Sequence, residues 1–304
     1  MQHSTMSYDE VRRMILACPG VGAAPMIRMP DVLESSMQKA TDLGFDMTVN
    51  GRTVKAIAQP TKHAFLFVFN RETGEPIWPI EERPVPQSDV PKERTSPTQP
   101  FPTKPVPFDR QGIIEDDLLD LTPALKAEAL EVVKRYKMGP LFTPPVLSSL
   151  DGPLATLTLP SEVGGGNWPG GSFDPENNFL YIHSHTQVFA NAVIPANPEQ
   201  SNMGYVGGQA RAAGPGRGAG AGGGRAGGPA PGRGGANVQG LPLVKPPYDR
   251  ITAYNMNSGD MVWQKTHSST PDDIKNHPAL KGLNLPRLGQ PGRTFIGVLT
   301  TRTL

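Results

Sequence analysis

One eleven-residue phrase occurs twice in this chain and constrains the fold more than any other feature. The first copy spans 68–78 (VFNRETGEPIW) and the second spans 253–263 (AYNMNSGDMVW). In each copy an alternating apolar run ends at an Asn, a short turn carries a Gly, and a second run ends at a Trp. Two apolar runs joined by such a turn are typical of a β-hairpin. A hairpin that recurs favours a repeat fold, and for units of this size a β-propeller.

Three residue types define the repeat at equivalent places in the two copies. The Gly is expected to supply the positive φ that the turn needs, and the Trp to act as one large apolar anchor at a fixed distance from it. The six positions are Asn70, Gly74, Trp78, Asn255, Gly259 and Trp263.

Charge and cysteine content exclude several classes of protein. The chain has 304 residues with 29 basic and 28 acidic side chains, so its charge balance indicates neither a nucleic-acid partner nor an anionic membrane. The single cysteine, Cys18, excludes an internal disulfide framework and a cysteine-based zinc site. The sequence as written shows no transmembrane run and no export signal.

Two stretches of biased composition interrupt the strand patterns. Ten prolines lie between Pro76 and Pro107, so the range 79–120 is predicted to be an irregular, extended excursion without ladder hydrogen bonds. The range 204–240 holds 16 glycines, four arginines and no acidic residue. We expect this Gly/Arg-rich insertion to be disordered rather than to bind RNA, because Tyr205 is its only aromatic residue.

Helical patterns occur in two places. Residues 1–44 read as helix, strand and helix, an α/β segment unlike the rest of the chain. A further helix is expected to begin at the N-cap Thr122 with Pro123 in its first turn, and to stop at Gly139. Its apolar face would consist of Leu125, Ala129, Val133 and Tyr136.

The surroundings of the hairpins resemble a known enzyme family. The phrases QPTKHAFLFVFN, IWPIEERPVPQSDVP, SPTQPFPTKPVPFDRQG, GGGNWPGGSFDPENNFLYI and IKNHPALKGLNLPRLGQPGR are similar to the PQQ-dependent dehydrogenases of the quinoprotein glucose and alcohol dehydrogenase group. The resemblance covers about 45–304. It implies a mainly β fold, namely three to four blades of an eight-bladed propeller, preceded by the short α/β segment.

The resemblance also implies a cofactor and residues that hold it. Pyrroloquinoline quinone (PQQ) would accept a hydride from a sugar or alcohol, and a quinone or cytochrome would accept the electrons, at the periplasmic face of the inner membrane. Lys62 matches the basic side chain that hydrogen-bonds the quinone oxygens, while Asn167 and Trp168 match the Asn and Trp beside the quinone. No nucleic-acid partner is expected.

Other members carry a catalytic Asp in a phrase rich in His and Trp, just before the position of 46–59. That phrase is absent here, as are the calcium ligands of the family, and the chain stops at Leu304 within an apolar run. We therefore expect a fragment that is inactive by itself and contains no metal site. His183 and His185 have metal-ligand spacing, but a surface strand is the simpler interpretation because no third ligand lies near them in the sequence.

The first 44 residues resemble a different family. The phrases QHSTMSYDEVRRMI, GAAPMIRMPD and QKATDLG are similar to metal-dependent pyruvate aldolases that cleave 2-keto-3-deoxy sugar acids, which are TIM barrels. By that resemblance His3 matches a general base and Arg28 matches the side chain that holds the keto acid.

These observations leave three hypotheses about function. The first is a fragment of a PQQ-dependent dehydrogenase joined near Gly44 and Phe45 to an aldolase fragment. The second is a non-catalytic, propeller-like binding protein that keeps the hairpins for a partner. The third is aldolase activity on a keto acid.

Overall fold

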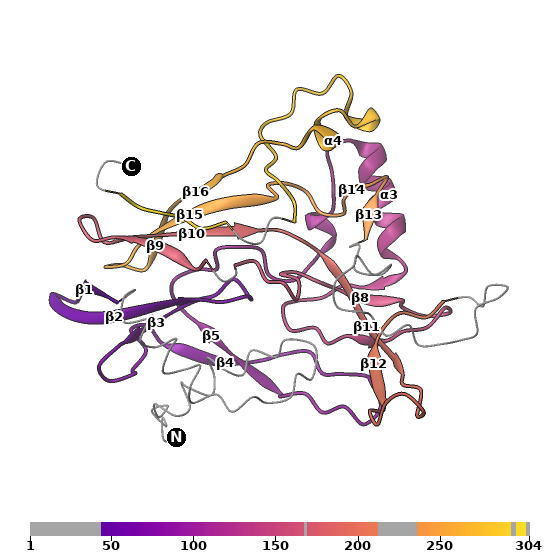
Figure 1. Cartoon of the computed structure of the whole chain (residues 1–304), viewed down its shortest axis with the longest axis horizontal. Coiled ribbons are helices and arrows are strands. Elements are labelled where there is room, and N and C mark those ends of the chain that lie inside the picture. Colours follow the sequence, from indigo (N-terminus) through magenta and orange to yellow (C-terminus); the bar gives the residue numbers. More distant parts are fainter. Residues whose placement is uncertain (1–43, 167–168, 212–235, 293–295, 302–304) are drawn as a thin grey trace.

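The computed structural model describes residues 44–166, 169–211, 236–292 and 296–301, which form a mainly β structure (Figure 1). The predicted α/β segment, with His3 and Arg28, therefore lies outside the described residues, and so do Asn167 and Trp168. Among the helices that are described, none is long and apolar enough to cross a membrane.

The first sheet is an antiparallel meander of three strands. It contains β1 (Phe45–Val49), β2 (Arg52–Pro60) and β3 (Leu66–Asn70) in that order. Asn50 and Gly51 join β1 to β2 with φ values of 51° and 76°, the conformation that makes Asn-Gly a strong hairpin signal. Four of the five residues of β3 are buried, which fits its apolar sequence.

The second sheet has four strands and packs on the first. Its order is β16 (Asp260–Thr266), β15 (Asp249–Asn255), β10 (Phe179–His185) and β9 (Gly171–Asp174). Figure 1 shows this sheet lying across β1–β3, and one core cluster joins the two. That cluster contains Phe45, Met47, Leu66 and Val68 from the first sheet and Leu180, Ile182 and Tyr254 from the second. Face-to-face packing of small antiparallel sheets is the arrangement of neighbouring propeller blades.

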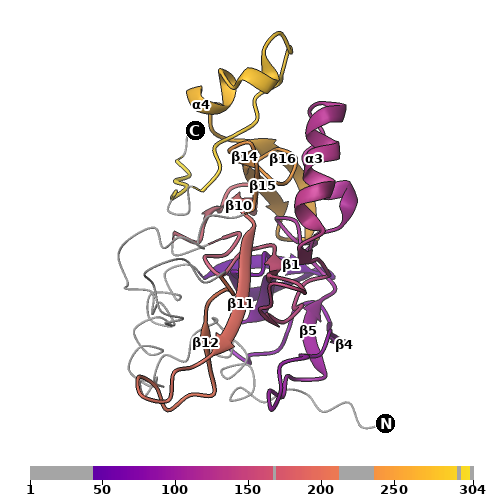
Figure 2. The same ribbon diagram turned by 90° about the vertical axis from the view of Figure 1, so that its right-hand side faces the viewer.

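The third sheet lies beside the helix α3 (Pro123–Val133). Its strands are β6 (Tyr136–Lys137), β7 (Val146–Leu147), β8 (Ala155–Thr158), β11 (Phe189–Pro195) and β12 (Tyr205–Gly207). The largest core cluster links α3 with β8 and with the hairpin of β13 (Asn237–Val238) and β14 (Leu241–Pro242). Figure 2 shows α3 toward the end of the molecule that also holds the C-terminal helix α4 (Asp272–Lys275), with β12 toward the opposite end. The short 3-10 helices are Glu115–Asp117 and Pro278–Leu280.

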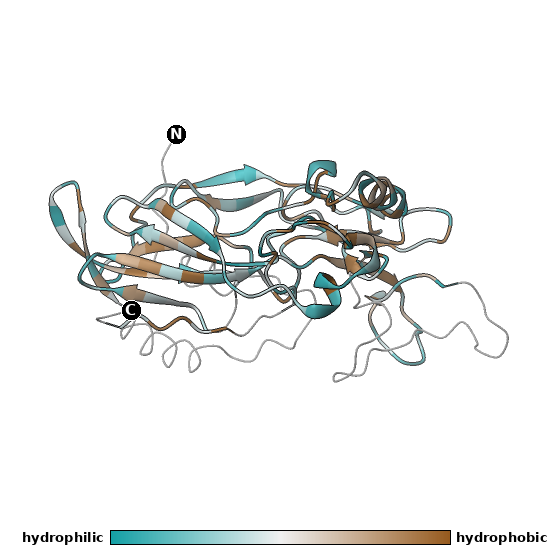
Figure 3. Ribbon diagram, turned by 90° about the horizontal axis from the view of Figure 1, so that it is seen from above, coloured by the Kyte–Doolittle hydropathy of each residue, from teal (hydrophilic) through white to brown (hydrophobic). Residues whose placement is uncertain are grey.

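Hydropathy follows the layers. Brown, apolar residues recur along the strands between the sheets in Figure 3, and teal, polar residues gather on the outer loops. Burial of this apolar surface is the main stabilising contribution to such a fold.

The prediction of an excursion without ladder hydrogen bonds is wrong. Within 79–120, β4 (Ile80–Pro84) pairs with β5 (Thr98–Pro102) along its full length. The prolines of both strands lie in alternate pairs, Ile80 with Pro102, Glu82 with Pro100 and Pro84 with Thr98. In a two-stranded ribbon alternate residues point their N–H groups away from the partner, so proline there removes no ladder bond.

Two other boundaries differ from the prediction. The helix α3 has the expected cap, with Thr122 Oγ1 accepting from Leu125 N, and buries Leu125, Ala129 and Val133. It ends at Val133, however, and Tyr136 lies in β6, because Tyr136 pairs with Ala155 of β8. The ends of the Gly/Arg-rich range 204–240 form β12, β13 and the start of the turn to β14, so disorder does not extend over all of it; 212–235 lies outside the described residues.

The two repeat turns are built alike. Gly74 N donates to Asn70 O at 2.8 Å, and Gly259 N donates to Asn255 O at the same distance. Both glycines have positive φ, 78° and 73°, and each Asn side chain accepts backbone N–H groups of its own turn. The hairpins differ after the turn. The second continues as β16, whereas the first makes only one bridge, between Phe69 and Pro76.

The two tryptophans have different environments. Trp78 packs into the core cluster between the first two sheets and lies against Gly259 of the other repeat. Trp263 lies on the second sheet beside Tyr181, with Lys265 Nζ 5.6 Å from its ring centroid. Trp78 therefore anchors one repeat on the other, a role that Trp263 does not share.

Candidate functional site

Lys62 lies in the tight turn that joins β2 to β3. Thr61 closes this turn, because its backbone N–H donates to Phe65 O at 2.9 Å and its carbonyl accepts from Ala64 N at 3.0 Å. Ala64 has a φ of 65°, a left-handed conformation that is uncommon outside glycine. The exposed Lys62 side chain is thus carried by a well-defined backbone.

The 161–166 loop meets this turn directly, although a hundred residues separate them. Gly165 N donates to Lys62 O at 2.9 Å, and Lys62 Nζ donates to Glu162 O at 3.2 Å. Gly164, with a φ of 92°, lies so close that an added Cβ would come within 2.7 Å of Lys62 Cγ. The loop runs on into Asn167 and Trp168. Lys62 and the 161–166 loop therefore form one unit, while Asn167 and Trp168 themselves lie outside the described residues.

A third segment, 108–112, lies behind both. Phe108 N donates to Ala64 O at 3.0 Å, and Gln111 Nε2 donates to His63 O at 2.7 Å. On the other side, Gly112 N donates to Leu159 O at 2.7 Å, just before the 161–166 loop. The 108–112 segment is therefore hydrogen-bonded both to the turn and to the residue two positions before the loop.

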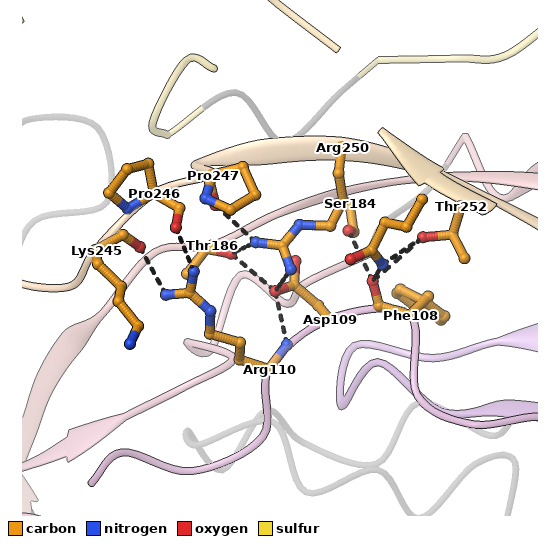
Figure 4. A network of polar contacts seen from close by, with 11 residues as sticks. Phe108, Asp109, Arg110, Ser184, Thr186, Lys245, Pro246, Pro247, Arg250 and Thr252 are labelled. Carbon is orange, nitrogen blue, oxygen red and sulfur yellow. Dashed lines mark hydrogen bonds and ion pairs between the residues drawn. The ribbon is translucent and has the colours of Figure 1, made fainter. Parts of the chain in front are cut away.

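Asp109 anchors the 108–112 segment to the second sheet (Figure 4). Its Oδ1 accepts from Thr186 Oγ1 at 2.8 Å and lies 3.3 Å from Arg250 Nη1. The Asp109 side chain is fully buried and the Arg250 side chain is 5% exposed. Arg250 also donates to Thr186 Oγ1 and to Pro247 O. These hydrogen bonds offset part of the cost of burying the two charges. Asp109 Oδ2 and Arg250 Nε are also buried and have no hydrogen-bond partner among the described residues.

The prediction that His183 and His185 lie on a surface strand is wrong, because they are 5% and 1% exposed. Their strand, β10, lies between β9 and β15 and is covered by neighbouring segments. His185 N donates to Gly165 O at 2.9 Å, so β10 also holds the 161–166 loop. Across the described ranges no group of three or more His, Cys, Asp and Glu side chains could hold a metal ion.

Burial lowers the pKa of His185 to about 4 and that of His63 to about 4. His185 is thus neutral when folded, whereas the unfolded chain takes up a proton below about pH 6.5. Stability is therefore lost as the pH falls from 6.5 towards 4.

We expect this His185 linkage to lower the free energy of unfolding by about 2 kcal/mol between pH 7 and pH 5. Urea unfolding of the wild type and of His185→Asn at both pH values measures it. The variant should show a smaller pH dependence, and equal pH dependence in the two proteins would contradict the assignment.

A cavity of about 380 Å³ opens beside Lys62. Its walls come from the 61–65 turn, the 85–99 part of the Pro-rich range, 140–145, β8, β11 and the start of the 161–166 loop. Nine of the lining residues are proline, leucine or phenylalanine. Lys62, Glu93 and Glu162 are the charged side chains among the described residues that line it. The volume lies within the range of small-molecule sites.

Two buried polar atoms near Lys62 have no hydrogen-bond partner among the described residues. They are Ser161 Oγ and Glu162 Oε2, and both residues line the cavity. Buried polar groups in folded proteins are nearly always paired, so unpaired ones beside a cavity point to a ligand or bound water.

Comparison with known proteins assigns the family. Residues 37–303 match the family model described as "PQQ: Glucose/ethanol/alcohol dehydrogenase, beta-propeller domain". The chain belongs to this PQQ family. The match begins inside the segment that resembles aldolases, and the comparisons give no support to that second resemblance. The domain boundary near residue 44 stays a prediction.

Curated relatives in the PQQ family cover most of this chain. It is 26% identical to quinate/shikimate dehydrogenase (quinone) of Acinetobacter baylyi over 82% of its length, and 28% identical to quinoprotein glucose dehydrogenase of Escherichia coli over 84%. It is 30% identical to the glycerol dehydrogenase large subunit of Gluconobacter thailandicus over 71%. The chain spans about 30% of the length of each of these relatives.

Among solved structures, a europium-containing methanol dehydrogenase aligns with 73% of this chain and 27% of its own, at 12% identity and a TM-score of 0.31.

The groups around Lys62 fit part of a PQQ site. PQQ is a flat o-quinone, and the Lys62 ammonium and Ser161 hydroxyl are hydrogen-bond donors suited to quinone oxygens. Glu93 and Glu162 do not suit the carboxylates of PQQ, so the rest of the cavity fits an uncharged molecule better than the cofactor.

Sequence reasoning missed Asp109, Arg250 and Glu162. Asp109 lies in the phrase FDRQG, which contributed to the resemblance without any role being assigned to it. Its partners Thr186 and Arg250 are 77 and 141 positions away, so no local spacing could reveal the cluster. An Asp within an apolar, Pro-rich stretch was the one available signal.

Proposed function

We propose that this chain supplies part of the PQQ site of an oxidoreductase that oxidises a sugar or another alcohol. The observation that carries the proposal is the direct contact between the Lys62 turn and the 161–166 loop. The contact joins Lys62 to the loop that precedes Asn167 and Trp168 in the sequence, and each of these three residues matches a cofactor-binding position of the family. Family membership supports the cofactor and the reaction class.

Lys62 has a defined task in such a site. PQQ supplies the hydride acceptor when it is bound, and negative charge develops on its quinone oxygens. The Lys62 ammonium, which donates to Glu162 O at 3.2 Å, can turn to a quinone oxygen and stabilise that charge through a charge-assisted hydrogen bond. The backbone bond from Gly165 N to Lys62 O holds the turn during this change.

We expect Lys62→Met to weaken PQQ binding about tenfold or more, because a hydrogen bond to a charged group is worth about 1.5–3 kcal/mol. Quenching of Trp fluorescence during PQQ titration, with Trp168 as the nearest reporter by sequence, measures the dissociation constant. Lys126→Met is the matched control, since the Lys126 ammonium also donates, in an exposed bond, to a backbone carbonyl, that of Glu115. Equal dissociation constants for the two variants would refute the role of Lys62.

The charges of the cavity favour uncharged, hydroxyl-bearing substrates over carboxylates. The two carboxylates, Glu93 and Glu162, outnumber the one ammonium, Lys62, among the charged side chains that line the cavity, and the neutral His63 adds no positive charge. Hydroxyl groups can donate to these carboxylates.

In saturation-transfer NMR, glycerol and glucose are therefore expected to bind the PQQ-loaded chain, while quinate is expected to show no signal. Glu93→Gln should bring quinate binding closer to that of glucose. Stronger binding of quinate than of glucose to the unaltered chain would reverse the proposed preference.

The remaining parts of the proposal concern the full-length protein. A general base and a metal ion are needed beside the quinone, and the described residues offer no metal cluster. We therefore expect PQQ binding without turnover from this chain alone. Dye reduction at an ordinary enzymatic rate with added PQQ and Ca²⁺ would contradict this. A periplasmic location and a quinone or cytochrome acceptor remain family-level expectations.

A further inference from the structure

The 108–112 segment connects the two halves of the proposed cofactor site. It holds the 61–65 turn through the bonds to Ala64 O and His63 O, and it is bonded to Leu159 O, two residues before the loop begins. None of these three bonds involves Lys62 itself. The relative position of the turn and the loop therefore depends on a segment that contributes no side chain to the cavity lining.

Packing between this segment and the loop is unusually close. A Cβ added to Gly165 would lie 3.3 Å from Asp109 Cβ, and one added to Gly166 would lie 3.0 Å from Phe108 Cζ. The buried side chains of Phe108 and Asp109 pack directly on these glycines, so little space remains to absorb a movement. A displacement of Phe108 or Asp109 is therefore expected to displace Gly165 and Gly166 as well.

Asp109 is the point at which the segment is fixed to the rest of the fold. Its Oδ1 accepts hydrogen bonds from Thr186 Oγ1 and from the backbone N–H of Arg110, and it forms an ion pair with the Arg250 guanidinium (Figure 4). The neighbouring Phe108 carbonyl accepts from Ser184 Oγ and Gln264 Nε2. Apart from Arg110, these partners lie on or directly after β10, β15 and β16. The second sheet therefore binds the segment at two successive residues, Phe108 and Asp109.

We propose that Asp109 is a positioning residue for the cofactor site. Through Thr186 and Arg250 it fixes the 108–112 segment, and the segment in turn sets the separation between Lys62 and the loop that leads to Asn167. The inference rests on the proposed function for its cofactor, but the mechanical link from Asp109 to the loop can be measured without any cofactor.

The experiment compares Asp109→Asn and Thr186→Val with the control Thr122→Val. Asp109→Asn removes the charge opposite Arg250. Thr186→Val leaves the Asp109–Arg250 pair in place and removes only the hydroxyl between them, so it serves if Asp109→Asn fails to fold. Thr122→Val is the same substitution at the N-cap of α3, where it costs stability of a similar size far from the loop.

Hydrogen exchange of two backbone amides measures directly how firmly Asp109 holds the 161–166 loop. Gly165 N–H donates to Lys62 O and His185 N–H donates to Gly165 O, so both report attachment of the loop. In Thr186→Val and Asp109→Asn we expect both amides to exchange about tenfold faster than in Thr122→Val at equal global stability. Exchange no faster than in the control would overturn the proposal.

PQQ titration supplies the second readout. The two variants near the loop should bind PQQ about tenfold more weakly, whereas Thr122→Val should bind like the wild type. Faster amide exchange with unchanged PQQ affinity would overturn the positioning role. Absence of PQQ binding by the wild type would instead refute the proposed function, while the exchange data would still decide whether Asp109 holds the loop.

Discussion

Arg250→Met is expected to lower the free energy of unfolding by about 3–5 kcal/mol, because it leaves the buried Asp109 carboxylate without its counter-charge. The side chain of Asp109 has no exposure to water, so solvent cannot replace the lost partner. The substitution also removes the donors to Thr186 Oγ1 and Pro247 O. Urea unfolding followed by circular dichroism measures the loss.

Arg83→Met is the matched control for this substitution. Arg83 forms an ion pair with Glu81 at 2.8 Å, closer than the buried pair, but both side chains are at least half exposed. Exposed pairs contribute about 1 kcal/mol or less. Replacing both buried partners, as in Arg250→Met with Asp109→Leu, should recover part of the stability because no lone charge remains. An equal decrease in the free energy of unfolding for Arg250→Met and Arg83→Met would show that burial of the Asp109–Arg250 pair does not raise its contribution to stability.

Gly259→Ala is expected to cost about 2–4 kcal/mol, from two additive causes. A φ of 73° strains any residue with a Cβ by about 1 kcal/mol or more. The new Cβ would also lie 2.7 Å from Cζ2 of Trp78, and forcing extra atoms into a packed contact costs about 1–3 kcal/mol. Thermal and urea unfolding measure the sum, and Trp fluorescence reports displacement of Trp78.

Gly51→Ala separates the two causes. Gly51 has nearly the same φ, 76°, but nothing lies within 4 Å of its added Cβ. The Gly51→Ala variant should therefore lose only the stability that the backbone strain costs. The difference between the two variants is the contribution of the Trp78 contact, which joins the first repeat to the second. If Gly259→Ala and Gly51→Ala lose equal stability, the Trp78 contact does not hold the repeats together.

Local rules account for the parts of the fold that the sequence predicted. The two Asn-to-Gly turns depend on hydrogen bonds within five residues, and the start of α3 depends on Thr122 accepting from Leu125 N. Lys62 was placed by a motif match, and the structure puts it in a tight turn beside the cavity. Such features need few partners from distant segments, so a single sequence is enough to indicate them.

Long-range contacts explain why two of the predictions from sequence were wrong. The prolines of β4 and β5 are compatible with a ribbon only because their alternate positions point away from the partner, and the register that decides this is set by pairing across 98–102. His183 and His185 look like an exposed pair until β9 and β15 enclose β10. Neither the register of β4 with β5 nor the burial of β10 can be predicted from the sequence of the strands themselves.

The sequence alone was sufficient for the repeat, the mainly β class and the family resemblance, because each rests on short-range turn chemistry or on continuous phrases. Tertiary structure was needed to show that Trp78 of one repeat packs on Gly259 of the other, and that Asp109 and Arg250 lie behind the loop leading to Asn167. Those contacts join residues 141 to 181 positions apart. Their energies depend on burial and on the exact approach of atoms, which arise only when the sheets pack.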